Sequence, residues 1–141
     1  MFPKKERGMT LIEILIVVVI IGLLAGLVVP RMFGKVGTAK LKSAKAQIEL
    51  FGTALDAFRL DVGRYPTIEE GMKSLREKPS GEENWKGPYL PKEIPNDPWG
   101  KPYIYKSPGE HGDYDLISLG ADGAEGGEGE NQDVVNWKDL S

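Results

Sequence analysis

The chain has 141 residues, a formal net charge of −3 and 40% hydrophobic residues. This length indicates one small domain with an appendage, enough for a single modest core. It has no cysteine and one histidine, His111. The composition therefore excludes a disulfide framework and a histidine-rich metal or catalytic cluster, and we expect a protein that is not an enzyme.

Residues 1–8, MFPKKERG, form a short basic leader peptide that precedes a long apolar run. A secretory signal peptide would continue with a shorter apolar run of about 7–15 residues and an A-x-A-like cleavage site. Here the run is longer and is followed by Pro30-Arg31-Met32. Ordinary signal-peptidase cleavage is therefore not expected.

The apolar run extends from Met9 to Val29. About 21 residues of helix span roughly 31 Å, enough to cross a bilayer core, so residues 9–34 are predicted to be a transmembrane half-helix. Basic residues lie on both sides of the run, and charge counting leaves its orientation open. Glu13 is the one charged residue inside it. An ionised carboxylate there costs about 2.5–3.5 kcal/mol, so Glu13 either has a partner or reaches back to the interface.

Two features of the span indicate how it packs. Gly22 and Gly26 form a G-x-x-x-G pair, a spacing that lets two helix backbones approach closely in lipid. Pro30 removes a backbone donor, so a kink is expected there rather than a clean helix end.

Residues 35–141 are predicted to form the globular domain, and the helix continues into it as far as Val62. Apolar residues recur there at spacings of three and four, namely Leu41, Ala44, Ile48, Phe51, Leu55, Phe58 and Val62. A two-stranded coiled coil is the alternative to packing within the domain. We favour the domain, because the stripe lasts only three heptads and ends at Gly63.

The next segment predicts a second helix, a loop and two strands. Thr67 and Glu70 form a capping-box pattern that starts a short amphipathic helix with Ile68, Met72 and Leu75. Seven prolines between Pro79 and Gly109 forbid long regular structure, but the interleaved aromatic residues indicate an ordered loop packed on the helix. Two short alternating runs, Tyr103–Lys106 and Tyr114–Leu119, predict an antiparallel pair of strands against the helix.

Residues 120–133, GADGAEGGEGENQD, combine five glycines with five carboxylates. Carboxylates this close repel each other unless a hard cation such as calcium neutralises them. The spacing is not that of an EF-hand. A flexible, solvated acidic loop is the alternative, but Val134, Val135 and Trp137 follow, so the chain must fold back to bury them.

These features together resemble the major pseudopilins of bacterial type II secretion systems. The leader motif is shared with type IV pilins, whereas the later blocks are specific to the major pseudopilins. The matching blocks are Gly8-Met9-Thr10-Leu11-Ile12-Glu13 with Pro30, Tyr65-Pro66-Thr67 with Glu70-Gly71, Trp85-x-Gly87-Pro88-Tyr89-Leu90, Asp97-Pro98-Trp99-Gly100-x-Pro102-Tyr103, Pro108-Gly109-x-His111-Gly112, and Ser118-Leu119-Gly120-Ala121-Asp122-Gly123 leading to Asp133 and Trp137.

The resemblance implies an α+β, pilin-like fold: a long N-terminal helix packed on a small antiparallel sheet, with a C-terminal calcium loop. It implies cleavage by a prepilin peptidase after Gly8 and methylation of the new amine of Met9, where family members usually have Phe. It also implies that Glu13 pairs with that amine on a neighbouring copy, and that the segment from Gly22 through Gly26 to Pro30 unwinds on assembly.

The implied function is that of a structural subunit that polymerises into a periplasmic pseudopilus and drives folded proteins across the outer membrane. The resemblance places the N-terminus in the cytoplasm, the helix in the inner membrane and the domain in the periplasm. The implied partners are further copies, minor pseudopilins, the peptidase and an inner-membrane assembly platform, with no nucleic acid. The implied calcium ligands are the Leu119 carbonyl, Asp122 and Asp133, while the contributions of Glu125, Glu128 and Glu130 stay open.

Three other functions remain in view. A pilus for adhesion or motility commonly closes its C-terminal region with a disulfide, which this chain lacks. A DNA-uptake filament would bind nucleic acid through Lys40, Lys42 and Lys45, on the helix expected to be buried in a fibre. A membrane-anchored binding module that never polymerises would keep its leader intact.

Overall fold

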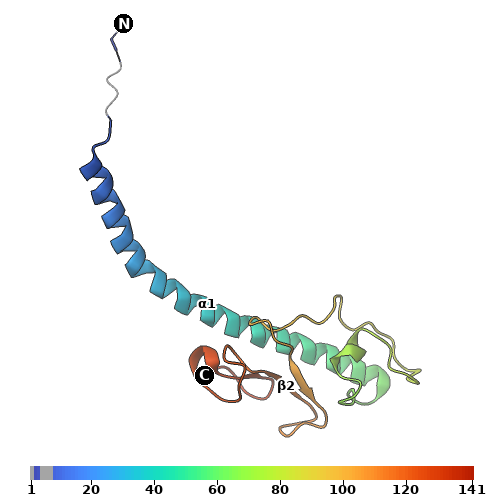
Figure 1. Cartoon of the computed structure of the whole chain (residues 1–141). Coiled ribbons are helices and arrows are strands. Elements are labelled where there is room, and N and C mark those ends of the chain that lie inside the picture. The colour runs from blue at the N-terminus through green and yellow to red at the C-terminus, as the bar shows by residue number, and fades with distance from the viewer. Residues whose placement is uncertain (1, 4–7) are drawn as a thin grey trace. The chain divides into compact units, whose positions relative to one another are not determined.

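The structure, a computed structural model, describes residues 2–3 and 8–141, with only the backbone of residues 30–33 (Figure 1). The basic residues of the predicted leader peptide, Lys4, Lys5 and Arg7, lie outside the described residues. The chain forms two compact units, residues 1–36 and residues 37–141. Each unit has its own structural logic.

The first unit holds the start of α1, a 52-residue helix that runs from Leu11 to Val62 and continues through Pro30. The side chains of residues 11–29 are exposed, and in the described part of the chain α1 is the one helix long and apolar enough to cross a membrane. An apolar surface of this extent is stable only against lipid or another protein.

In the second unit the predicted apolar stripe of α1 forms one side of the core. Leu41, Ala44, Ile48, Phe51, Leu55 and Phe58 are buried, and Val62 packs against them at the edge. The stripe therefore covers the protein's own domain, as predicted.

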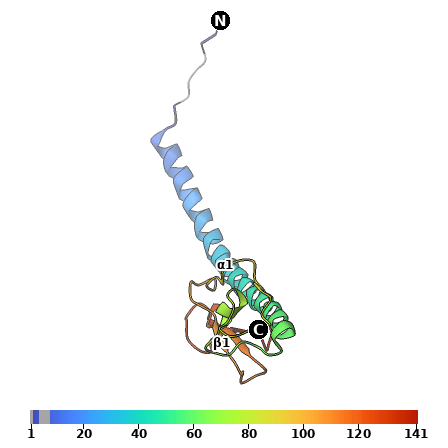
Figure 2. The same ribbon diagram turned by 90° about the vertical axis from the view of Figure 1, so that its right-hand side faces the viewer.

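A three-stranded antiparallel sheet lies beside this part of α1 (Figures 1 and 2). Strands β1 (Ile104–Lys106) and β2 (Asp115–Ser118) fall within the two predicted runs, and Tyr105 pairs with Leu116. Strand β3 (Val134–Val135) pairs Val134 with Ser118 on the other side of β2. It was not predicted as a strand, because two residues show no periodicity.

The prediction of a short amphipathic α-helix after Thr67 is wrong. The segment forms turns followed by one 3-10 turn, η1 (Met72–Leu75), and Ile68 is 54% exposed. The reciprocal capping bonds between Thr67 and Glu70 do form, at 3.0 and 3.2 Å. Gly71 then adopts φ +60°, a left-handed conformation that cannot continue an α-helix.

Aromatic rings hold the proline-rich loop to the domain, as the sequence predicted. The indole N–H of Trp85 donates to the carbonyl of Ser74 at 2.7 Å, and the hydroxyl of Tyr89 donates to Asp61 at 2.8 Å. Tyr103 stacks edge-on against Phe51 with ring centroids 5.1 Å apart. The rings of Trp85 and Tyr89 bury a large area while their polar atoms keep partners, whereas the Tyr103 hydroxyl is buried and has no hydrogen-bond partner among the described residues.

Phe58 and Leu60 provide a matched pair for testing this core, because they lie two residues apart on α1 and are 0% and 86% exposed. Phe58→Ala should lower the free energy of unfolding of the domain by about 3–5 kcal/mol through lost burial and the cavity left behind. Leu60→Ala should change it by less than about 0.5 kcal/mol. Denaturant unfolding of the full chain in detergent, followed by tryptophan fluorescence, measures both, and equal effects would contradict the assigned core face.

Candidate functional site

The first candidate site is the start of α1, where Gly8, Met9 and Thr10 form an exposed, non-helical segment. Thr10 is the N-cap, and Glu13 is three residues further on. The backbone N–H of Thr10 donates to Glu13 Oε2 at 3.0 Å, and the backbone N–H of Glu13 donates to Thr10 Oγ1 at 3.3 Å. This is a complete capping box, which satisfies two amide groups that the helix start would otherwise leave without a partner.

Sequence reasoning missed this cap, although the signal was present. Thr10-x-x-Glu13 is the same pattern that identified Thr67-x-x-Glu70. The Thr10 hydroxyl also donates to Glu13 Oε2, at 3.3 Å, so the bonds of Thr10 converge on one carboxylate oxygen. In the described part of the chain Glu13 Oε1 has no hydrogen-bond partner, and it can accept a second donor.

The other predicted assembly residues lie along the same helix. Gly22 and Gly26 are exposed, and a Cβ built at either glycine would meet no described atom within 4 Å. The surface at both positions is therefore open to a neighbouring helix. Pro30 continues the helical backbone, and its side chain lies outside the described part.

The second candidate site is the acidic glycine loop, residues 120–133. Its turns use glycines with positive φ, such as Gly120 at 72° and Gly127 at 99°. The backbone N–H of Ala121 donates to the carbonyl of Glu130 at 2.9 Å, which closes the base of the loop. The loop includes a short 3-10 turn, η2 (Gly129–Asn131).

Asp133 is the residue of this loop that best fits a cation. Its Oδ2 accepts the backbone N–H of Gly126 at 3.0 Å, whereas its Oδ1 is buried and has no hydrogen-bond partner. A buried carboxylate oxygen without a donor is costly unless a cation faces it. Leu119, Glu125 and Asp133 line the same cavity of about 340 Å³, so two of the three predicted ligands are brought together.

Asp122, the third predicted ligand, does not line this cavity. It is exposed, and its Oδ1 accepts the backbone N–H of Ala124 at 3.2 Å. Among the residues that the structure describes, no three carboxylate or histidine groups are arranged to hold a metal ion. The donor chemistry fits calcium at Asp133 and the Leu119 carbonyl, and the predicted role of Asp122 remains a prediction.

The cavity is also lined by Asp115, which is buried on β2. Burial pushes the pKa of Asp115 upward, but hydrogen bonds from the ring of His111 and from the backbone N–H groups of Glu110 and His111 hold it below its ordinary value. The ring of His111 stacks on Trp137 with centroids 3.8 Å apart. The single histidine of the chain thus has a structural place beside the cavity.

The C-terminal segment is tied to α1 by Lys45. Its ammonium donates to the carbonyls of Val135 at 2.7 Å and Lys138 at 2.8 Å. The carboxylate of Glu130 occupies the space that a Cβ at Gly37 would fill. Lys45, one of the three lysines considered above for nucleic-acid binding, therefore makes its contacts within the domain.

Comparisons with known proteins agree over nearly the whole chain. Residues 31–137 match the family model described as type II secretion system (T2SS), protein G, and residues 3–29 match the prokaryotic N-terminal methylation motif. The type II secretion system core protein G of Pseudomonas aeruginosa is 47% identical over 138 residues, which cover 95% of this chain and 96% of that protein. The corresponding protein of Vibrio cholerae is 44% identical over 137 residues, with 95% and 93% covered.

A solved structure shares the fold. The crystal structure of the major pseudopilin from the type 2 secretion system of enterohaemorrhagic Escherichia coli matches with a TM-score of 0.64 at 33% identity, and the match covers 77% of this chain and 95% of that one. The predicted pilin-like α+β fold is confirmed. The methylation motif and the exposed apolar helix together fit a membrane-anchored chain.

Gly120 and Gly81 provide a matched test of the loop closure, since both have positive φ, at 72° and 79°. A Cβ at Gly120 would lie 2.5 Å from the carbonyl oxygen of Gln132, whereas a Cβ at Gly81 meets open space. Gly81→Ala should cost about 1–2 kcal/mol from backbone strain alone. Gly120→Ala should cost roughly 2–4 kcal/mol, because the backbone at Gln132 must also move. Denaturant unfolding of both variants measures the difference, and equal costs would show that the loop base is not closed as described.

Proposed function

Because the chain belongs to the type II secretion system protein G family and is a structural subunit of the pseudopilus, we propose that identical copies polymerise through the first turn of α1. The observation that carries this proposal is the geometry of Glu13. Its Oε2 caps its own helix, and its Oε1 has no partner among the described residues. A subunit with this role supplies shape and cohesion rather than catalysis.

Processing by a prepilin peptidase would create the group that completes the site. Cleavage after Gly8 leaves Met9 with a free amine, which the same enzyme methylates. Gly8 and Met9 lie in an exposed segment outside the helix, where a peptidase has access to the bond. The amine is then a cation at the membrane edge, four residues from Glu13.

In the proposed contact, Oε1 of Glu13 accepts the amine of Met9 on the neighbouring copy. A carboxylate and an amine that are both removed from water are strongly favoured as a pair, because either charge alone is costly there. The capping bonds hold the Glu13 side chain in one direction before the neighbour arrives, so less conformational entropy is lost on pairing. The pairing also sets the register of each incoming copy.

The assembled fibre would stand in the periplasm, with each copy drawn from the inner membrane, N-terminus on the cytoplasmic side. Minor pseudopilins would start it, an inner-membrane platform would add copies, and its growth would push folded proteins through an outer-membrane channel. The exposed Gly22 and Gly26, together with Pro30, give a segment that can unwind at low cost as copies pack.

Glu13→Gln separates the capping role from the charge. Glutamine can replace glutamate in a capping box, so the helix start is retained, but the negative charge is lost. We expect normal membrane insertion and cleavage with at least a tenfold lower yield of sheared fibres. The full chain is produced together with its peptidase, the fibres are counted by electron microscopy, and the N-terminus is checked by mass spectrometry. Thr10→Ala, which removes the cap hydroxyl and keeps the charge, is the control and should assemble far better, while a normal fibre yield with Glu13→Gln would refute the pairing.

We also propose that the acidic loop binds calcium through Asp133 and the Leu119 carbonyl, with Asp122 as a further ligand. The buried, unpartnered Oδ1 of Asp133 supports this proposal. A bound divalent cation would neutralise the carboxylates of the loop and offset the cost of burying Asp133.

Calcium should raise the melting temperature of the full chain in detergent by about 5 °C or more, because it binds the folded loop and not the unfolded one. Asp133→Ala should abolish the rise, and Asp122→Ala tests the remaining ligand in the same way. Glu69→Ala, an exposed carboxylate outside the loop, is the matched control and should keep the full rise. A melting temperature that changes with neither calcium nor a chelator would refute the proposed calcium site.

A further inference from the structure

A lysine from outside the acidic loop lies against it. The ammonium of Lys101 is in contact with Gly123 and occupies the space that a Cβ at Gly123 would fill. Gly123 has φ +64°, and it directly follows Asp122, one of the predicted calcium ligands. A positive charge of the protein itself therefore lies beside a residue that is expected to bind a cation.

The backbone of Lys101 is fixed close to the start of the same loop. Its N–H donates to Asp97 Oδ1 at 2.8 Å, and its carbonyl accepts the backbone N–H of Asp97 at 2.7 Å. The other oxygen of this buried carboxylate, Oδ2, accepts the hydroxyl of Ser118 at 2.8 Å. Ser118 directly precedes Leu119, whose carbonyl is another predicted ligand. The base of the Lys101 side chain is therefore held near Leu119, and its charged end lies beside Asp122.

The charges around Lys101 give its position an electrostatic consequence. Among the described residues, none of the five carboxylates of the loop makes an ion pair, and Lys101 makes none either. The charge of Lys101 therefore acts on the loop over a distance rather than through a bond. In the calcium-free loop the ammonium offsets the repulsion among the carboxylates, whereas beside a bound cation it is a like charge.

We propose that Lys101 sets the calcium affinity of the acidic loop, because its ammonium partly neutralises the empty loop and repels the ion that enters it. This role rests on the calcium binding proposed above and adds the residue that limits its strength. The coupling is reciprocal: Lys101 weakens calcium binding by the same factor by which calcium weakens the stabilisation that Lys101 provides. The ammonium then supports the loop at low calcium, and the ion supports it at high calcium.

Coulomb's law gives the expected size of the effect. Two to three residues of extended chain span roughly 7–10 Å, which is the scale on which charges of one loop act on each other. In water at about 10 mM salt, a unit charge at such a distance changes the affinity for a divalent ion about three- to fivefold. At about 1 M salt the screening length falls to about 3 Å, so most of this difference should vanish.

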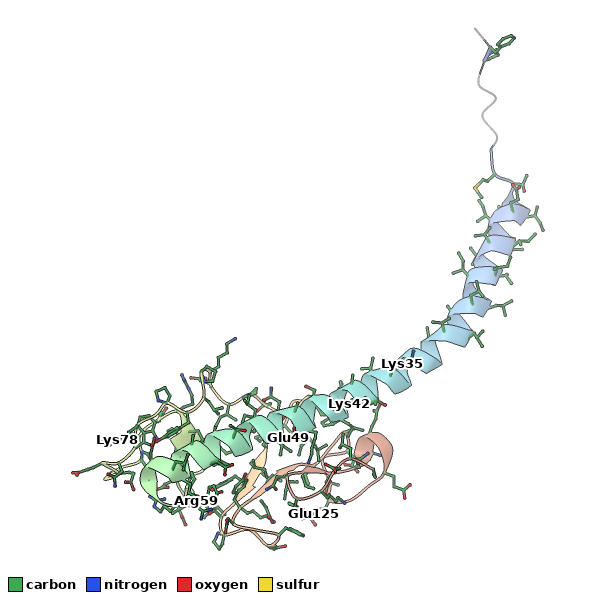
Figure 3. All side chains as sticks on the ribbon, turned by 180° about the vertical axis from the view of Figure 1, so that it is seen from behind. Lys35, Lys42, Glu49, Arg59, Lys78 and Glu125 are labelled. Atoms are coloured by element: carbon green, nitrogen blue, oxygen red, sulfur yellow. The ribbon has the colours of Figure 1, made fainter. Side chains whose placement is uncertain are left out.

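Three substitutions of Lys101 separate its charge from its length, with calcium binding by the full chain in detergent measured by calorimetric titration at about 10 mM salt. Lys101→Met removes the charge and should lower the Kd about three- to fivefold. Lys101→Glu reverses the charge and should lower the Kd by about the square of that factor, and Lys101→Arg should leave it unchanged. Lys78→Met is the control: Lys78 is exposed and lies at the other end of the domain from Glu125 of the loop (Figure 3), so the wild-type Kd is expected.

Thermal melting in a chelator gives a second readout with the opposite sign. Without calcium, Lys101→Met should melt below the wild-type chain, because the carboxylates lose the charge that offsets them, and saturating calcium should reduce this deficit. A Kd that is unchanged or higher in Lys101→Met and Lys101→Glu, a difference that persists at about 1 M salt, or an equal effect of Lys78→Met would each overturn the role of Lys101 and leave the calcium site standing. A wild-type chain that binds no calcium would refute the calcium site itself, and this role with it.

Discussion

The helix α1 carries more apolar surface than one small domain can cover, and the rest of the molecule follows from this constraint. Within residues 37–141 the domain covers one stripe, from Leu41 to Phe58. The side chains of residues 11–29 are left uncovered. Burial of apolar surface contributes about 25 cal/mol per Å², so the uncovered part favours lipid or further copies over water. A helix of this kind is stable as a component of a membrane or of an assembly.

The domain covers its stripe of α1 with little regular structure. Its sheet has strands of only three, four and two residues, and no disulfide is available. Hydrogen bonds made by side chains hold the segments of the domain together in place of a longer sheet. The buried carboxylate of Asp97 accepts the hydroxyl of Ser118 at 2.8 Å and the backbone N–H of Lys101 at 2.8 Å, which fixes the turn before β1 to strand β2. Arg64 binds Glu70 with two bonds of 2.8 and 2.9 Å, and this hydrogen bonding lowers the pKa of Glu70.

The sequence predicted those features that are repeated along the chain. The core stripe of α1 recurs over three heptads, so Ile48 and Phe58 could be placed without coordinates. The prediction from sequence failed where one backbone angle determines the local structure. Gly71 has φ +60° and ends a helical pattern that the side chains alone would continue. Strand β3 could not be predicted, since two residues pair only because β2 is already beside them. The same limit applies to the acidic loop, whose composition could not show that Asp133 is turned inward and Asp122 outward.

The acidic loop and the helix are joined by contacts that no local pattern encodes. Lys45 lies on α1 and binds two carbonyls of the C-terminal segment, so the end of the chain holds the helix that begins the domain. The carboxylate of Glu130 fills the space beside Gly37, which is buried and has no side chain to displace it. A cation that orders this loop would therefore also fix the first turn of α1 in the domain.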